Sequence, residues 1–156
     1  DAISAVLTDF GSTDYLVEIG GELRASGNGQ QDSPWRVAIE RPDPRQVSKV
    51  RIIELRDQSI ATSGEYRNYY ERDGVRVSHT IDPRTGRPVS HQLVAVSVLA
   101  DQCAFADARA TALEVLGPED GYALAIEQGW EALFLILNED GRFVELATPT
   151  FNQNVE

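Results

Sequence analysis

Short runs of alternating apolar and polar residues, separated by turn signals, constrain the fold of this chain more than any other feature. The clearest run covers residues 35–40, where Trp35, Val37 and Ile39 share one face of an extended chain. Asp-Gly pairs at residues 73–74 and 140–141 are typical of tight hairpin turns. The pattern therefore predicts antiparallel strands joined by hairpins.

Strands are expected at residues 15–19, 22–26, 35–40, 50–55, 66–71, 75–81, 93–100, 132–137 and 142–146. Residues 1–10 have the periodicity of a helix end, and residues 103–116 and 119–128 predict two helices separated by Gly117-Pro118. Residues 61–64 fit a turn, and residues 82–88 a turn-rich loop. The predicted fold class is α+β, a mixed and mostly antiparallel sheet with hairpins and two consecutive helices late in the chain.

Length and charge limit the possible functions. The 156 residues fit one domain, and the net charge of −11 opposes non-specific binding to nucleic acid or to an anionic membrane. The sequence contains no apolar run of the ~20 residues that a membrane span needs, and its single cysteine excludes an intrachain disulfide. Because the chain has no methionine, we expect a processed product or a piece of a longer polypeptide.

Two small-residue segments have both a structural and a functional interpretation. Gly20-Gly21 lies inside a strand pattern between Glu18 and Glu22, which indicates either a bend or bulge or a close approach of the backbone to a ligand. Residues 61–66 place Thr62 and Ser63 before Gly64, which suits a plain turn or a turn that presents its polar groups to a phosphate.

Two further segments carry polar side chains suited to catalysis or metal binding. Period-two alternation puts His79 at the end of an apolar stripe, as a structural histidine or as part of a site with the following loop. Asp107 and Thr111 are four residues apart and share a helix face, and both supply the oxygen ligands that Mg²⁺ prefers. Alternatively, Asp107 complements the dipole of a helix start.

The order of these segments resembles the ApbE family of flavin transferases. The matching stretches are VEIGGELRASG at 17–27, WRVAIERP at 35–42, ATSGEYRNYY at 61–70, SHTIDPRTGRPV at 78–89, VAVSVLADQC at 94–103, ADARATAL at 106–113 and LG at 116–117. The resemblance implies a T-fold-related architecture and identifies residues 1–156 as the C-terminal portion of a single domain whose N-terminal half is absent from this chain.

The resemblance also implies roles for individual residues. Asp107 and Thr111 match the family's Mg²⁺ ligands, and His79 and Asp82 match the residues expected to act in catalysis. Residues matched to the FAD-binding positions are Glu18, Gly20, Gly21, Ser63, Gly64, His79, Ile81 and Thr85.

The reaction implied by the resemblance is the transfer of FMN from FAD to a Thr or Ser hydroxyl of a target flavoprotein, with release of AMP. The alternatives are an enzyme that only hydrolyses FAD to FMN and AMP, and a chain that binds FAD without catalysis. Members of the family are commonly periplasmic lipoproteins, so the resemblance also implies a cell-envelope location, with a possible lipid anchor on the missing N-terminus.

Overall fold

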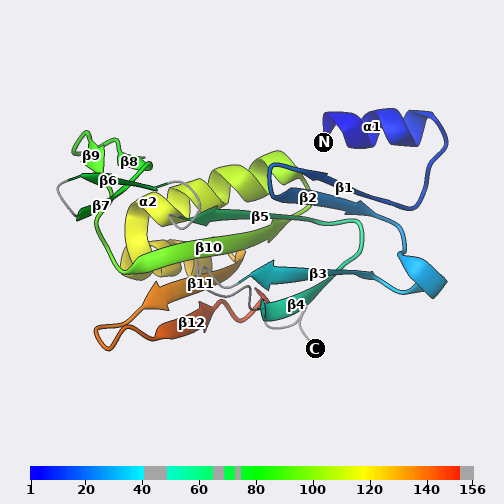
Figure 1. The fold of residues 1–156 in the computed structure, drawn as a ribbon. Coiled ribbons are helices and arrows are strands. Elements are labelled where there is room, and N and C mark those ends of the chain that lie inside the picture. The colour runs from blue at the N-terminus through cyan, green and yellow to red at the C-terminus, as the bar shows by residue number, and fades with distance from the viewer. Residues whose placement is uncertain (41–48, 65–68, 73–74, 152–156) are drawn as a thin grey trace.

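A six-stranded antiparallel sheet organises the computed structural model, which describes residues 1–40, 49–64, 69–72 and 75–151 (Figure 1). The strand order of this sheet is β1-β2-β5-β10-β11-β12. Its strands are β1 (Tyr15–Ile19), β2 (Glu22–Ser26), β5 (Ser59–Gly64), β10 (Leu93–Ala100), β11 (Glu131–Leu137) and β12 (Phe143–Ala147). Within the same ranges, smaller ladders pair β3 (Trp35–Glu40) with β4 (Lys49–Leu55), β6 (Tyr69–Arg72) with β7 (Val75–Ser78), and β8 (Ile81–Asp82) with β9 (Arg87–Pro88).

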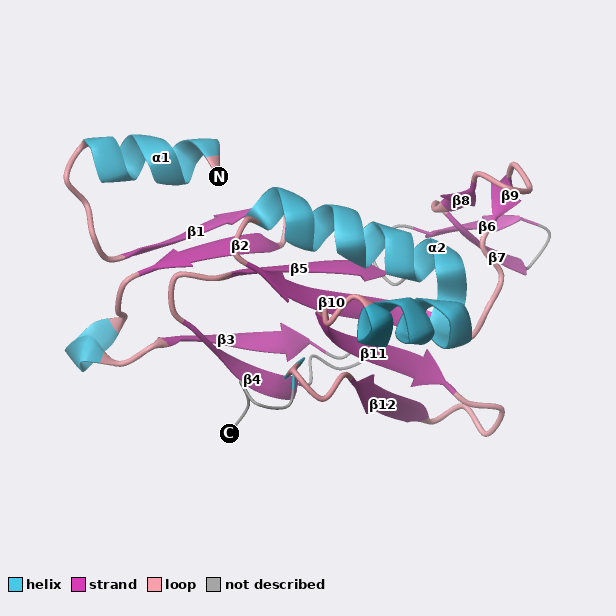
Figure 2. Ribbon diagram, turned by 180° about the vertical axis from the view of Figure 1, so that it is seen from behind, coloured by secondary structure: helices cyan, strands magenta, loops and turns pink. Residues whose placement is uncertain are grey.

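Helix α2 (Cys103–Glu127) covers one face of the sheet, as the view from behind shows (Figure 2). Gly117 interrupts this helix with φ of +83° and ψ of −177°, and Pro118 follows directly. A backbone with these angles cannot continue a helix, so α2 consists of two helical segments that meet at Gly117. This confirms the two consecutive helices and the α+β fold class expected from the sequence.

Apolar side chains fill both faces of the sheet. Toward α2, the core contains Val96, Val98, Leu113 and Phe134. On the opposite face, a second core packs the sheet against β3 and β4. Its buried members are Ala25, Ile39, Ile53, Leu55, Ile60, Leu99, Leu133 and Phe151. Strand β10 therefore has apolar residues on both sides, which explains its continuous run of β-branched and aliphatic residues.

The turn expected at residues 61–64 is wrong, because these residues belong to β5. Strand β5 lies between β2 and β10, and its first three residues, Ser59, Ile60 and Ala61, are buried. The strand expected at residues 75–81 is also shorter, since β7 ends at Ser78 and Ile81 begins β8. The Asp-Gly pair at residues 73–74 lies outside the described residues.

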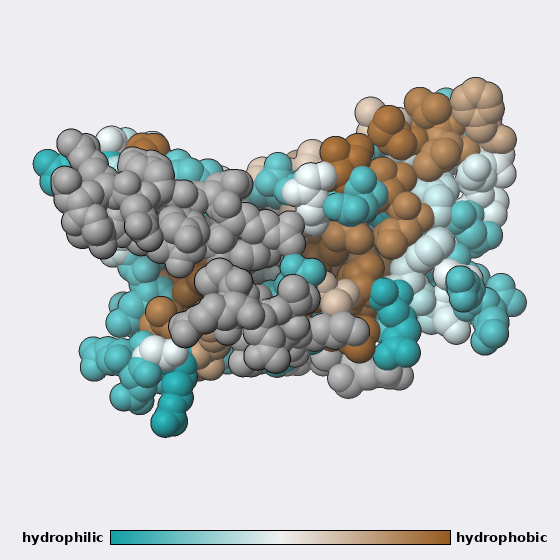
Figure 3. Space-filling model, viewed as in Figure 1, coloured by the Kyte–Doolittle hydropathy of each residue, from teal (hydrophilic) through white to brown (hydrophobic). Residues whose placement is uncertain are grey.

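Helix α1 (Ala2–Asp9) projects from the rest of the chain at the end of the sheet that carries β1 and β2 (Figure 1). The Asp1 carboxylate accepts hydrogen bonds from the backbone N–H groups of Cys103 and Ala104, which joins this helix to the start of α2. Ile3, Val6 and Phe10 stay exposed, and Figure 3 shows hydrophobic side chains gathered along this part of the surface. In the described part of the chain, no helix combines the length and apolar character required to cross a membrane.

Candidate functional site

A cavity of about 570 Å³ opens beside the end of β5, between the main sheet, β3 and α2. It is lined by residues from five separate parts of the chain: the β1–β2 hairpin, β3, β5, His79 and the first segment of α2. The described lining residues are Leu16, Glu18, Gly20, Gly21, Glu22, Leu23, Val37, Ala38, Ile39, Glu40, Ile60, Thr62, Ser63, Gly64, His79, Asp107 and Thr111.

The glycine pair forms a tight hairpin turn at one wall of this cavity. Gly20 and Gly21 have φ of +69° and +107°, and the flanking residues Ile19 and Glu22 pair across the hairpin. Positive φ at both central positions is typical of a two-residue hairpin turn and is readily adopted by glycine. The bend predicted at this segment is therefore confirmed as a hairpin turn and not a bulge, while the close approach of this backbone to a ligand remains a prediction.

The end of β5 forms another wall because β2 leaves it uncovered. Strand β2 pairs with β5 only at Ile60 and Ser59, so the residues from Thr62 to Gly64 extend beyond that ladder and reach the cavity. The Thr62 Oγ1 atom lies 2.7 Å from the Oγ atom of Ser97 on β10. The Ser63 hydroxyl donates a hydrogen bond to the buried carboxylate of Glu114 on α2.

Asp107 and Thr111 both line the cavity from the first segment of α2. A carboxylate and a hydroxyl one helical turn apart fit a hard cation such as Mg²⁺. Among the described residues, no group of three or more His, Cys, Asp or Glu side chains could hold a metal ion. This donor set therefore suits a cation that completes its coordination with other oxygen atoms, such as those of water or phosphate.

The cavity wall is acidic. Four carboxylate side chains line it, those of Glu18, Glu22, Glu40 and Asp107, while its described lining includes neither lysine nor arginine. These four carboxylates would repel an anionic ligand, and a cation that binds with the ligand would reduce this repulsion.

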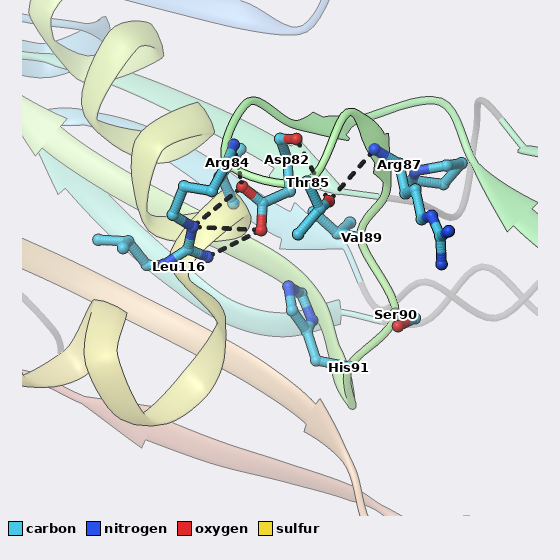
Figure 4. Close-up of a pocket in the computed structure, with 10 residues that line it drawn as sticks. Asp82, Arg84, Thr85, Arg87, Val89, Ser90, His91 and Leu116 are labelled. Atoms are coloured by element: carbon cyan, nitrogen blue, oxygen red, sulfur yellow. Dashed lines mark hydrogen bonds and ion pairs between the residues drawn. The ribbon is translucent and has the colours of Figure 1, made fainter.

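The loop after β7 is divided between two cavities. His79 lines the first cavity and is exposed. Asp82 and Thr85 instead line a second cavity of about 510 Å³ beside the end of the first segment of α2, drawn in Figure 4. Ile81 is 49% exposed and lines neither cavity.

Asp82 is held by its neighbour Arg84. The Arg84 side chain folds back onto the Asp82 carboxylate, with N–O distances of 3.0 to 3.2 Å, and the Arg84 backbone N–H also donates to this carboxylate (Figure 4). These hydrogen bonds from Arg84 lower the pKa of Asp82, and the same pairing raises the pKa of Arg84. A carboxylate stabilised in this way is a weak base at neutral pH.

The structure thus brings together eight of the residues predicted for the site and separates three others from them. The eight that share the first cavity are Glu18, Gly20, Gly21, Ser63, Gly64, His79, Asp107 and Thr111, and the three outside it are Ile81, Asp82 and Thr85. Glu22 and Thr62, which belong to two segments singled out from the sequence, also line this cavity, whereas Glu40 was missed. Glu40 ends the alternating run at residues 35–40, but nothing in that pattern indicates that β3 borders the cavity.

Similar proteins are found both by sequence and by structure. A sequence model of the ApbE family matches residues 1–134. The FAD:protein FMN transferase of Vibrio cholerae is 47% identical over 97% of this chain and 45% of its own length, and that of Escherichia coli K12 is 40% identical over 97% and 43%.

Solved structures show the same likeness. The apo form of the flavinyl transferase ApbE from Pseudomonas stutzeri matches with a TM-score of 0.85 and 46% identity, over 99% of this chain and 48% of that one. The chain spans about half the length of the relatives it matches. With a family match over most of its residues and a shared fold, the chain belongs to the ApbE family.

Proposed function

We propose that the protein catalyses the Mg²⁺-dependent transfer of FMN from FAD to a Thr or Ser hydroxyl of a target flavoprotein, with release of AMP. One observation carries this proposal: a single cavity of a chain of the ApbE family collects Asp107, Thr111 and His79. The relatives named FAD:protein FMN transferase support the same reaction. These relatives are about twice as long as this chain.

The acidic wall of the cavity supports a role for a divalent cation. FAD carries a pyrophosphate, which four carboxylates would repel. The Asp107 carboxylate and the Thr111 hydroxyl would hold Mg²⁺ at this wall. When bound, Mg²⁺ neutralises charge on the pyrophosphate and on the leaving AMP.

His79 is the better candidate for the general base. In the proposed reaction, the acceptor hydroxyl oxygen bonds to the phosphorus of the FMN half, and the bond between that phosphorus and the oxygen shared with AMP breaks. The acceptor proton passes to His79, and AMP leaves with the bridging oxygen. His79 lines the cavity, whereas Asp82 lines another cavity and is stabilised as a carboxylate by Arg84.

The hydrolysis of FAD to FMN and AMP is the alternative reaction at the same site. In that reaction, water takes the place of the acceptor hydroxyl. The exposure of His79 supports this alternative, because water reaches this side chain in the described structure.

A mass measurement distinguishes the two reactions. The natural full-length protein is incubated with FAD, Mg²⁺ and a flavoprotein domain that carries an acceptor Thr, and the intact mass of that domain is measured. A gain of one FMN supports the transferase, and free FMN and AMP without this gain support the hydrolase. If FAD stays intact in the presence of Mg²⁺ and the target domain, both reactions are contradicted. A parallel sample with EDTA tests the need for the divalent cation.

A further inference from the structure

A fully buried carboxylate lies directly behind the wall of the proposed FAD cavity. Glu114 has no exposed surface and follows Thr111 by three residues on α2, so the two side chains leave the same side of the helix. Burial of a carboxylate is costly unless hydrogen bonds compensate for the lost water. One of these bonds comes from the hydroxyl of Ser63, which itself lines the cavity.

The main chain of Glu114 is also held in place. The His91 Nε2 atom lies 2.7 Å from the backbone oxygen of Glu114, and since a carbonyl oxygen can only accept, this nitrogen donates. The His91 ring packs against Gly117, where α2 changes direction. Glu114 is thus restrained through its backbone as well as through its side chain.

From this geometry we infer that Glu114 is a positioning residue that makes Ser63 a hydrogen-bond acceptor toward the bound nucleotide. A serine hydroxyl has one proton and two lone pairs. Because its proton is directed to Glu114, Ser63 offers the cavity only its lone pairs. The group that Ser63 binds is therefore an N–H or O–H donor, such as the imide of the flavin ring or a sugar hydroxyl, and not a phosphate oxygen. This inference rests on the proposed function, which puts FAD in the cavity.

The test measures FAD binding and kinetics for four variants of the full-length protein. They are Ser63→Ala, Glu114→Ala, the double variant and Glu114→Gln. The loss of one hydrogen bond between neutral groups weakens binding by about tenfold at most. We therefore expect Ser63→Ala and Glu114→Ala each to raise the Kd for FAD and the KM for FAD by about five- to tenfold, with kcat at saturating FAD changed by less than about threefold.

The double variant and the glutamine variant separate positioning from a structural role. If Glu114 acts through Ser63, the double variant binds FAD no more weakly than Ser63→Ala alone. Glu114→Gln keeps a carbonyl oxygen that can accept the Ser63 proton, so it should bind FAD like the natural protein. Leu113→Ala is the matched control, because Leu113 is a fully buried neighbour on α2 that belongs to the apolar core. It should lower the melting temperature without changing the Kd for FAD.

Several outcomes would overturn the inference. One is a Ser63→Ala variant with unchanged FAD affinity. Another is a double variant whose loss of FAD affinity equals the sum of the two single losses. The third is a Glu114→Gln variant that binds FAD as weakly as Ser63→Ala does. If Glu114→Ala does not fold, the FAD affinities of the Ser63→Ala and Glu114→Gln variants still test the inference. FAD binding is measured without turnover, so a natural protein that binds FAD but transfers no FMN contradicts the proposed function alone. A natural protein that binds no FAD contradicts both.

Discussion

Replacing Gly117 by alanine should lower the free energy of unfolding by about 3 kcal/mol. Gly117 has φ of +83° and ψ of −177°, a region that is almost restricted to glycine, and forcing another residue into it costs about 2 kcal/mol. The added Cβ would also lie 3.0 Å from the His91 ring. If this ring moves away, its 2.7 Å hydrogen bond to the Glu114 backbone is lost, at a further cost of about 1 kcal/mol.

Gly129→Ala provides a matched control. Gly129 follows α2 with φ of +64°, but a Cβ there would meet no atom within 4 Å. Only the left-handed backbone opposes alanine at that position, so its cost should be about 1 kcal/mol. The two variants differ in crowding, while both remove a glycine of positive φ near α2.

Urea unfolding followed by circular dichroism gives both free energies, and thermal melts provide a second measure. For a domain of this size, 3 kcal/mol corresponds to a decrease in Tm of about 6–12 °C. If Gly117→Ala were no less stable than Gly129→Ala, the explanation of the bend in α2 would be refuted. A second substitution, His91→Ala, should cost less in the Gly117→Ala background than in the natural protein, because the hydrogen bond to the Glu114 backbone is already lost there.

Further predictions concern the proposed chemistry. Asp107→Ala should abolish Mg²⁺-dependent turnover of FAD, and unchanged turnover would contradict the metal assignment. His79→Ala should lower kcat by about 10²- to 10⁴-fold, as expected for a general base, and more than Asp82→Asn does. Asp82 should titrate below the usual range of an aspartate in an NMR pH series, and Arg84→Gln should return its pKa toward that range. Because the folded pKa is lowered, this pair stabilises the protein above the unfolded pKa, and the effect is lost as pH falls through the folded value.

The fold was predictable where local patterns decide the structure. Alternation over residues 35–40 identified β3, and Gly117-Pro118 marked the bend in α2, because both signals depend on neighbouring residues. Strand β5 was missed because Thr62, Ser63 and Gly64 are typical turn residues. Its strand conformation comes from the ladder with β10, which pairs residues more than 30 positions apart.

The site was only partly predictable for a similar reason. Asp107 and Thr111 share a helix face, so their proximity follows from spacing alone. The sequence order of residues 79–85 does not show that this loop divides, with His79 at one cavity and Asp82 and Thr85 at another. Nor does any local pattern connect Ser63 with Glu114, since they lie 51 residues apart and meet only when α2 packs on β5.

The acidic wall of the cavity suits a site where the negative charge of a nucleotide is offset by a dissociable cation and not by a fixed side chain. A site that neutralised pyrophosphate with arginine would keep its positive charge after the reaction and would continue to hold AMP. Under the proposed function, the carboxylates of the described lining repel a nucleotide, and a cation that binds and leaves would offset this repulsion. If this cation is Mg²⁺, as proposed, FAD affinity is linked to Mg²⁺ concentration, and the wall repels AMP once the cation departs. The net charge of −11, which opposes binding to nucleic acid, thus also favours the release of an anionic product.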